Sequence, residues 1–138
     1  MAPLAIFIQS GTAQSLHHAL GLAITATSCG EHVVIALFSE GMASWVEAHR
    51  SGAETFGSSP HGEQLEAGFR RLNVPPLPTL LAECRQIAGD RLEVLGCSGA
   101  VELLGFDADE LMDRSWVDDV VGLPTIWRRT SGARIVSI

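Results

Sequence analysis

Lysine and tyrosine are absent from this sequence of 138 residues, and all nine of its basic residues are arginines. The absence of lysine excludes a Schiff-base lysine or a P-loop lysine, and the absence of tyrosine excludes a phenolic acid or nucleophile. Sixteen acidic residues outnumber the arginines and give a formal charge of −7 at pH 7. With so little positive charge, the chain is not expected to bind the phosphate backbone of a nucleic acid.

Charge of either sign is scarce. Charged residues make up 18% of the chain and apolar residues 46%, whereas charged residues form about 25% of an average soluble domain. A chain of this length and composition has room for one sizeable core, so we expect a single domain over residues 1–138. The low charged fraction also predicts apolar surface that a partner covers, which favours a homo-oligomer.

Long hydrophobic runs and cysteine pairs are also missing. No apolar run approaches the ~20 residues that a membrane span requires, and residues 1–11 lack the basic region of a signal peptide. Three cysteines without a CxxC pair do not suit a disulfide framework. We therefore expect a cytoplasmic protein with free thiols and no contact with a membrane.

Short apolar runs alternate with helical periodicity along the chain. This alternation, together with the nearly continuous apolar runs, predicts an α/β fold: a three-layer α/β/α sandwich with a mostly parallel five-stranded sheet. The expected strands are residues 4–9, 32–38, 91–97, 117–123 and 133–138, and the expected helices are residues 16–27, 41–49, 63–73, 79–88, 100–106, 107–112 and 125–130.

Polar, glycine-rich and proline-rich residues interrupt this pattern, and we expect a flexible insertion at residues 51–78. In folds of this class, ligands bind at the carboxyl ends of the parallel strands. That edge is predicted to carry Ser10–Gly11, Ser39–Glu40, Cys97–Ser98 and Gly122–Leu123. The functional site is expected there.

The predicted order of strands makes Cys97 the candidate reactive residue. It ends an apolar strand and precedes a helix, so backbone N–H groups of Ser98, Gly99 and Ala100 would face its sulfur and favour a thiolate. The alternative is a small buried residue that fills a tight turn. Cys84 falls on an apolar helical stripe and is expected in the core.

Other candidate functional residues and motifs have less support in the sequence. Cys29 ends the first helix near carbonyl groups that disfavour a thiolate, so we expect it to be inert. A phosphatase or rhodanese loop needs an arginine six residues after its cysteine, and Leu103 stands there. His17 and His18 point ~100° apart on a helix, which argues against a metal site. We expect His18 to face solvent and His17 to flank the strand-end cleft.

The turn after the first strand is a further candidate for binding. Ser10 and Gly11 precede a helix and suit a small anion, but a dinucleotide fingerprint needs more glycines than this turn has. The expected ligand-binding residues are therefore Ser10, Gly11, Ser98 and Gly99, and no cofactor is expected. Arg128 either holds an anionic partner or offsets a helix dipole.

The order of these elements resembles that of a known family. The first strand ends in Ser10–Gly11, an Ala/Leu-rich helix follows, and a glycine precedes the apolar second strand. Later, LLAECRQIAG leads into LEVLGCSGAVELLGF, and DADELMD and VVGLPTIW come next. Outside residues 51–78, the chain resembles the DsrE/DsrF-like sulfur-relay family, in the branch with a cysteine-to-glycine segment after the third strand, here Cys97 to Gly105.

This resemblance implies a five-stranded parallel α/β/α domain, a trimeric or hexameric assembly, and a cysteine that carries sulfur as a persulfide between partner proteins. Cys97 is the one residue carried over. We therefore expect a small cytoplasmic sulfur-transfer protein with donor and acceptor proteins as partners, acting either as a sulfurtransferase or as a sulfur carrier. Two alternatives stay open: a non-catalytic oligomeric module that binds a small anion or a partner at the strand ends, and a thiol redox sensor that forms sulfenic acid.

Overall fold

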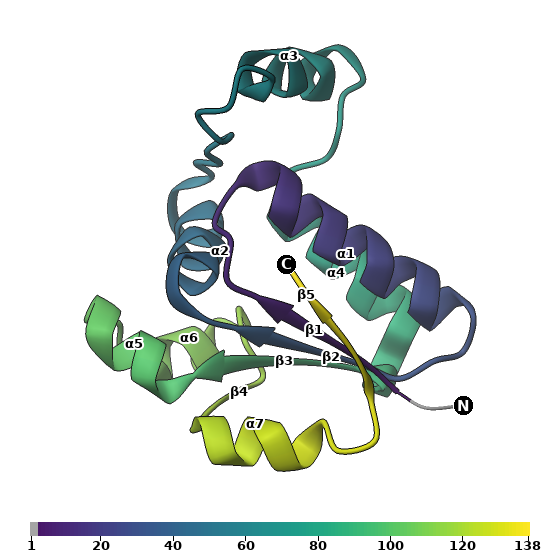
Figure 1. The fold of residues 1–138 in the computed structure, drawn as a ribbon, viewed down its shortest axis with the longest axis vertical. Coiled ribbons are helices and arrows are strands. Elements are labelled where there is room, and N and C mark those ends of the chain that lie inside the picture. The colour runs from purple at the N-terminus through teal and green to yellow at the C-terminus, as the bar shows by residue number, and fades with distance from the viewer. Residues whose placement is uncertain (1–2) are drawn as a thin grey trace.

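A five-stranded parallel sheet lies at the centre of the computed structural model, which describes residues 3–138 (Figure 1). The strands are β1 (Leu4–Ile8), β2 (Val33–Leu37), β3 (Leu92–Cys97), β4 (Asp119–Val121) and β5 (Arg134–Ser137). Their order across the sheet is β4-β3-β2-β1-β5, and every neighbouring pair is parallel. The predicted α/β fold and five-stranded sheet are confirmed. Residues 1–2, which entered the signal-peptide argument, lie outside the described residues.

Helices connect the strands and form the outer layers of the sandwich. Within residues 3–138 they are α1 (Ala13–Ser28), α2 (Ser39–Ser51), α3 (Gly62–Arg71), α4 (Leu77–Ala88), α5 (Ser98–Leu104), α6 (Ala108–Asp113) and α7 (Leu123–Arg129), with a 3₁₀ turn at Gly89–Arg91. The expected starts of the fourth helix at residue 79 and of the last helix at residue 125 are wrong, because these helices begin at Leu77 and Leu123. Pro78 and Pro124 lie in the first turns, where a helix needs no N–H donor.

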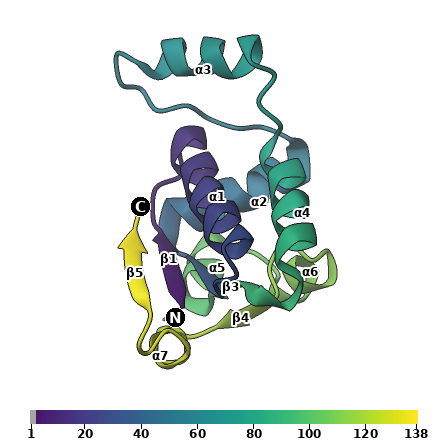
Figure 2. The same ribbon diagram turned by 90° about the vertical axis from the view of Figure 1, so that its right-hand side faces the viewer.

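The larger core lies between the sheet and helices α1, α2 and α4 (Figure 2). Its strand residues are Leu4, Ile6, Ile8, Val33, Ile35, Leu37, Leu92 and Val94, all buried. Leu20, Trp45 and Cys84 are among the fully buried helix residues against them, which confirms Cys84 as a core residue. Nε1 of Trp45 donates a hydrogen bond to the carbonyl oxygen of Trp116 at 2.8 Å. We term this side of the sheet the α1–α4 face.

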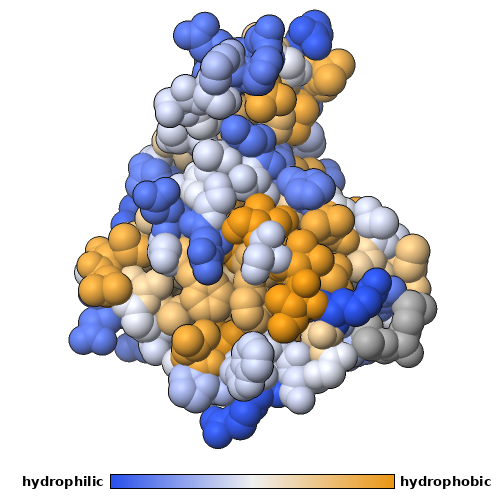
Figure 3. All heavy atoms as spheres, in the orientation of Figure 1, coloured by the Kyte–Doolittle hydropathy of each residue, from blue (hydrophilic) through white to orange (hydrophobic). Residues whose placement is uncertain are grey.

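The opposite side of the sheet has a thinner cover. Strand side chains alternate between faces, and the fully buried strand residues on this side are Ala5, Ala36 and Leu95, the last two packed with Ile126 of α7. Around them pack Phe7, Val34, Phe38, Cys97 and Val121, which stay partly exposed. Figure 3 shows hydrophobic residues gathered where β1, β2 and β5 lie in Figure 1. We term this side the α7 face.

Residues 52–76 lead from α2 to α4 and contain α3, which stands apart from the sheet in both views (Figures 1 and 2). Polar contacts and the packing of Phe69 on His17 join this segment to α1. Oε1 of Glu54 lies 2.5 Å from Nε2 of His17, and the Ala13 N–H donates to the Thr55 carbonyl oxygen at 2.7 Å. The helix expected over residues 63–73 is confirmed as α3, and the flexibility expected for residues 51–78 stays a prediction.

Candidate functional site

Cys97 lies where the sequence placed it, at the turn from a parallel strand into a helix. It ends β3, pairs in register with Val121 of β4, and its backbone is extended at φ −69° and ψ 122°. Its side chain is partly exposed and its thiol is free. Alternation along β3 puts Cys97 on the same face as Leu95, which is the α7 face.

The sulfur of Cys97 lies beside the first turn of α5. A Cβ atom added to Gly99 would be 3.9 Å from Sγ, and both Ser98 and Gly99 are exposed. Within the part of the chain that the structure describes, the Cys97 side chain accepts no capping hydrogen bond from α5. The helix N-terminus is therefore adjacent to the sulfur without donating a hydrogen bond to it.

A hollow of about 490 Å³ opens beside Cys97 between α2 and α5. Among residues 3–138, Glu40 is the one ionisable group in its lining besides Cys97, and the large apolar side chains there are Phe38, Leu103 and Leu104. We term it the Cys97 hollow. An apolar lining with one carboxylate suits a neutral or apolar group better than a small anion.

Ser39, at the edge of the Cys97 hollow, has a strained backbone. Its φ of +47° lies in the left-handed region, which costs an L-residue about 1–2 kcal/mol. The strain coincides with a tight approach of α2 to the end of β1, because a Cβ atom on Gly41 would lie 2.6 Å from the Ile8 carbonyl oxygen. Strain of this kind is often found at functional sites.

Four residues of the hollow were not selected from the sequence. Phe38 is the N-cap residue of α2, Ala43 lies in α2, and Leu103 and Leu104 come from α5. Leu103 is 90% exposed, the highest value among the large hydrophobic residues that the structure leaves in solvent. Two successive leucines in so short a helix were an available signal, because one turn cannot bury both on the same face.

Ser10 lies away from Cys97, because β2 separates β1 from β3 in the sheet. Two strand spacings put the ends of these strands about 10 Å apart. The Ser10 hydroxyl donates to Oγ of Ser15 at 2.9 Å, and Oγ1 of Thr12 accepts the Ser15 N–H at 3.3 Å. These hydroxyl groups therefore serve the N-terminal cap of α1.

Gly11 lines a neighbouring hollow of about 420 Å³, which has Glu40 and Ala43 in common with the Cys97 hollow. The four residues that were expected to bind a ligand therefore do not line one common hollow. Gly99 lines the Cys97 hollow, Gly11 lines the neighbouring one, and neither hollow includes Ser10 or Ser98 in its wall.

The other two thiols have different surroundings. Cys84 is fully buried, and desolvation raises the pKa of its thiol, opposed by a hydrogen bond with Thr27 and by the positive charge of Arg85. Cys29 is exposed at the end of α1. By exposure alone, Cys29 would be the candidate reactive thiol. Cys97 instead combines partial exposure with a hollow and an adjacent helix N-terminus.

The remaining candidate residues are placed as follows. His18 is exposed, as predicted, and His17 pairs with Glu54 instead of lining the Cys97 hollow. Arg128 is exposed on α7 and lines a hollow with Trp127.

Over residues 3–138, no group of three or more His, Cys, Asp or Glu side chains is placed to hold a metal ion. None of the helices in this range has both the length and the apolar character for crossing a bilayer.

The comparisons with known proteins support the fold and show no function. No protein-family model matches the chain, and no curated protein matches it. Among solved structures, it is similar to MTH1491 from Methanobacterium thermoautotrophicum, described as a protein of unknown function, with a TM-score of 0.61 and 16% identity over 100% of each chain. Fold and site together define an α/β protein with a partly exposed thiol at the carboxyl edge of a parallel sheet.

Proposed function

We propose that this protein is a sulfur carrier in which Cys97 accepts sulfane sulfur and passes it to a partner protein. The observation that carries the proposal is the position of Cys97: a partly exposed thiol at the carboxyl edge of the sheet, open to a hollow of its own. Thiols presented in this way are reachable by a second molecule, whereas a core thiol such as Cys84 is not.

The transfer needs no oxidant or cofactor. The Cys97 thiolate attacks the outer sulfur of a donor persulfide, R–S–SH, and the donor S–S bond breaks as the new one forms. The donor leaves as the thiolate R–S⁻, and Cys97 becomes Cys–S–SH. Delivery is the same reaction with an acceptor thiolate as the attacking group, which restores the Cys97 thiolate.

The surroundings of Cys97 favour a protein partner over a small anionic donor. Glu40 gives the hollow a negative charge, and Leu103 stands exposed at its wall. An exposed leucine beside a thiol offers apolar contact area to an approaching protein surface. Three free thiols also fit a reducing compartment, which supports the proposed cytoplasmic location.

The test is loading with a persulfide donor, followed by mass spectrometry of peptides. We expect a gain of about 32 Da, one sulfur atom, on the peptide that contains Cys97. Cys97→Ser should abolish this gain, and the matched variant Cys29→Ser should retain it, because Cys29 is exposed but lines neither hollow described above. Sulfur found mainly on Cys29 in the wild type would show that exposure alone controls loading and would overturn the proposal.

A non-catalytic module that binds a partner at the same hollow is the second candidate. The apolar lining beside Cys97, with no capping hydrogen bond to its sulfur among residues 3–138, favours this alternative. The two proposals differ in a partner-capture assay. Binding that survives Cys97→Ser but is lost in Leu103→Ser supports the module, provided that wild-type protein also fails to load sulfur.

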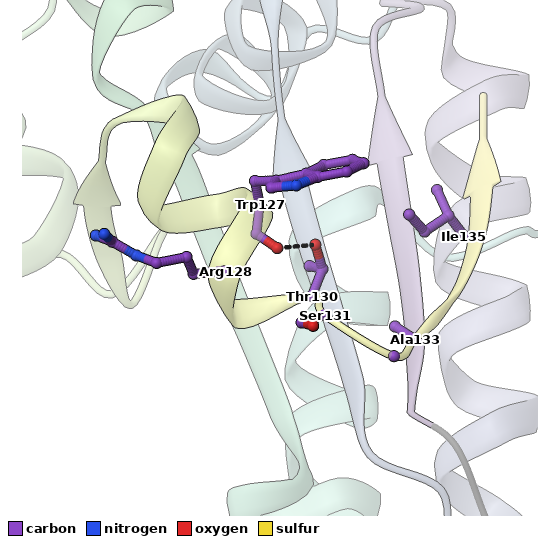
Figure 4. A pocket seen from close by; sticks show the side chains of 7 residues that line it. Trp127, Arg128, Thr130, Ser131, Ala133 and Ile135 are labelled. Carbon is purple, nitrogen blue, oxygen red and sulfur yellow. Dashed lines mark hydrogen bonds between the residues drawn. The ribbon is translucent and has the colours of Figure 1, made fainter.

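We also propose that copies of the protein associate through the α7 face, in the trimer or hexamer that the family resemblance implies. Trp127 is 66% exposed and Ile135 is 46% exposed, and both lie beside the partly exposed sheet residues of this face. Figure 4 shows the Trp127 indole reaching from α7 toward Ile135 of β5 over a hollow of about 400 Å³. Apolar side chains placed in this way favour burial against a second protein surface.

A further inference from the structure

A hollow of about 380 Å³ lies between α1 and the 52–76 segment and shares no lining residue with the Cys97 hollow. Its wall includes the ionisable residues His17, Glu54, Glu66 and Arg70 and the aromatic residues Phe56 and Phe69. We term it the His17 hollow. Nothing in the sulfur-carrier proposal uses it.

His17 and Glu54 form a partly buried pair at this hollow. Nε2 of His17 is 2.5 Å from Oε1 of Glu54, and a carboxylate only accepts, so Nε2 carries the proton that it donates. In the neutral imidazole, Nδ1 is then an acceptor with a free lone pair. The His17 side chain is 8% exposed, and Nδ1 is buried without a hydrogen-bond partner among residues 3–138.

The other incompletely bonded groups in this region are acceptors too. Gln14 lies one turn before His17 on α1, and its Oε1 is buried without a partner within the described residues, but Gln14 does not line the His17 hollow. Oε2 of Glu54 accepts a single long hydrogen bond, from the Leu77 N–H at 3.4 Å. Buried polar groups are normally satisfied. A group in the hollow that satisfies Nδ1 of His17 and Oε2 of Glu54 must therefore supply N–H or O–H donors.

Charge and aromatic content narrow the class of ligand. Glu54 and Glu66 face one guanidinium, that of Arg70, which pairs with Glu66 at 2.8 Å. With His17 neutral, the lining carries a net charge of −1. Phe56 and Phe69 pack edge to face with ring centroids 4.8 Å apart, and Phe69 packs against His17 at 4.9 Å. Aromatic rings attract cations and pack well on alkyl chains.

We propose that the His17 hollow binds a small organic cation with N–H donors, of the alkylammonium or alkylguanidinium class. Its charged head forms an ion pair with Glu54 and donates to Nδ1 of His17, and its alkyl part packs on Phe56 and Phe69. The site is independent of Cys97, so binding occurs whether or not the protein carries sulfur.

The test is an NMR titration of the full chain at pH 8, where an imidazole is ordinarily neutral. Three probes of nearly equal size are compared: n-butylammonium chloride, n-butanol and sodium butyrate. We expect n-butylammonium to shift the His17 Nδ1 resonance in a saturable way and to bind at least about tenfold more tightly than n-butanol, with no saturable effect of butyrate. Equal binding of n-butylammonium and n-butanol, or no saturable shift with n-butylammonium, overturns the proposal.

Two variants locate the site. Glu54→Gln should weaken n-butylammonium binding at least about tenfold, because it removes the partly buried carboxylate charge. Glu63→Gln, an exposed carboxylate on the first turn of α3 outside the hollow, is the matched control and should leave binding unchanged. The amide resonances of α3 report whether Glu54→Gln keeps the 52–76 segment in place. Because the comparison of probes uses wild-type protein, it decides the proposal even if this variant loosens the segment.

Discussion

The α1–α4 face and the α7 face belong to one sheet but differ in how completely helices cover them. On the α1–α4 face, the core side chains of β1, β2 and β3 are at most 7% exposed, and Val120 and Val136 of the outer strands are partly exposed. The helix residues Leu20, Trp45 and Cys84, which cover this face, have zero exposure. On the α7 face, one helix of seven residues packs on the sheet, and Phe7 and Phe38 remain partly exposed. The first face therefore provides most of the apolar burial that stabilises the fold, and the second carries Cys97 and the surface proposed for association.

The largest expected effect is a loss of stability on the α1–α4 face. Leu20→Ala removes a fully buried side chain from α1 in a core with little room to collapse, so the free energy of unfolding should fall by about 3 kcal/mol. This change in the free energy of unfolding is measured by urea unfolding followed by circular dichroism. A loss below about 1 kcal/mol would mean that this core is loosely packed.

The same truncation on the other face should cost less. Ile126 is fully buried, but its neighbours include the partly exposed Phe7 and Val121, which are free to move into the space. Ile126→Ala should therefore reduce the free energy of unfolding by about 2 kcal/mol, at the lower end of the range for such truncations. A loss equal to that of Leu20→Ala would mean that both faces are packed equally well.

A smaller effect is expected from pH, through His49 of α2. Burial lowers the pKa of His49 from its ordinary 6.5, opposed in part by the hydrogen bond from its Nδ1–H to the Trp45 carbonyl oxygen. Below pH 6.5 the unfolded chain then binds a proton that the folded chain binds only at lower pH, so stability should fall as the pH drops.

Unfolding by urea from pH 8 to pH 5, with His49→Gln beside the wild type, measures this contribution. The difference in stability between the two proteins should change in favour of the variant as the pH falls. Exposed His18 provides the matched control, and His18→Gln should follow the wild-type curve. If the His49→Gln curve stays parallel to that of the wild type, burial does not control this histidine.

The smallest effect on stability is expected at the most exposed part of the α7 face. Because Trp127 is 66% exposed, Trp127→Ser should change the free energy of unfolding of the dissociated chain by no more than about 0.5 kcal/mol. The oligomeric state, measured by light scattering after size exclusion, should nevertheless decrease. Leu72→Ser, at a residue 70% exposed beyond the end of α3, is the matched control and should leave the assembly intact. A wild-type monomer at micromolar concentration would contradict the proposed association.

Local patterns in the sequence were enough to predict the sheet and the position of Cys97. Apolar runs such as HVVIALF give buried strands because a parallel sheet covered on both sides excludes polar side chains. The turn at Cys97–Ser98 follows from the place where such a run ends. Both features depend on neighbouring residues, which is why a single sequence reveals them.

The walls of the hollows were not predictable in the same way. Phe38 and Leu103 meet beside Cys97 because α2 and α5 lie next to each other, and no spacing in the chain encodes that contact. The pairing of His17 with Glu54 joins α1 to the 52–76 segment through residues 37 positions apart. Contacts of this kind are set by the packing of whole elements, so the structure was needed to find them.

The place of β5 in the sheet has a consequence for synthesis on the ribosome. β5 pairs with β1, with Leu4 opposite Arg134, so the outer edge of β1 stays unpaired until the more C-terminal β5 has been translated. At 5–20 residues per second this wait lasts roughly 10 s. During that time β4, β3, β2 and β1 are able to assemble with the α1–α4 face, while the edge of β1 offers free N–H and C=O groups to other nascent chains. Until β5 is made, β1 is therefore an open sheet edge, although the finished sheet places this strand in its interior.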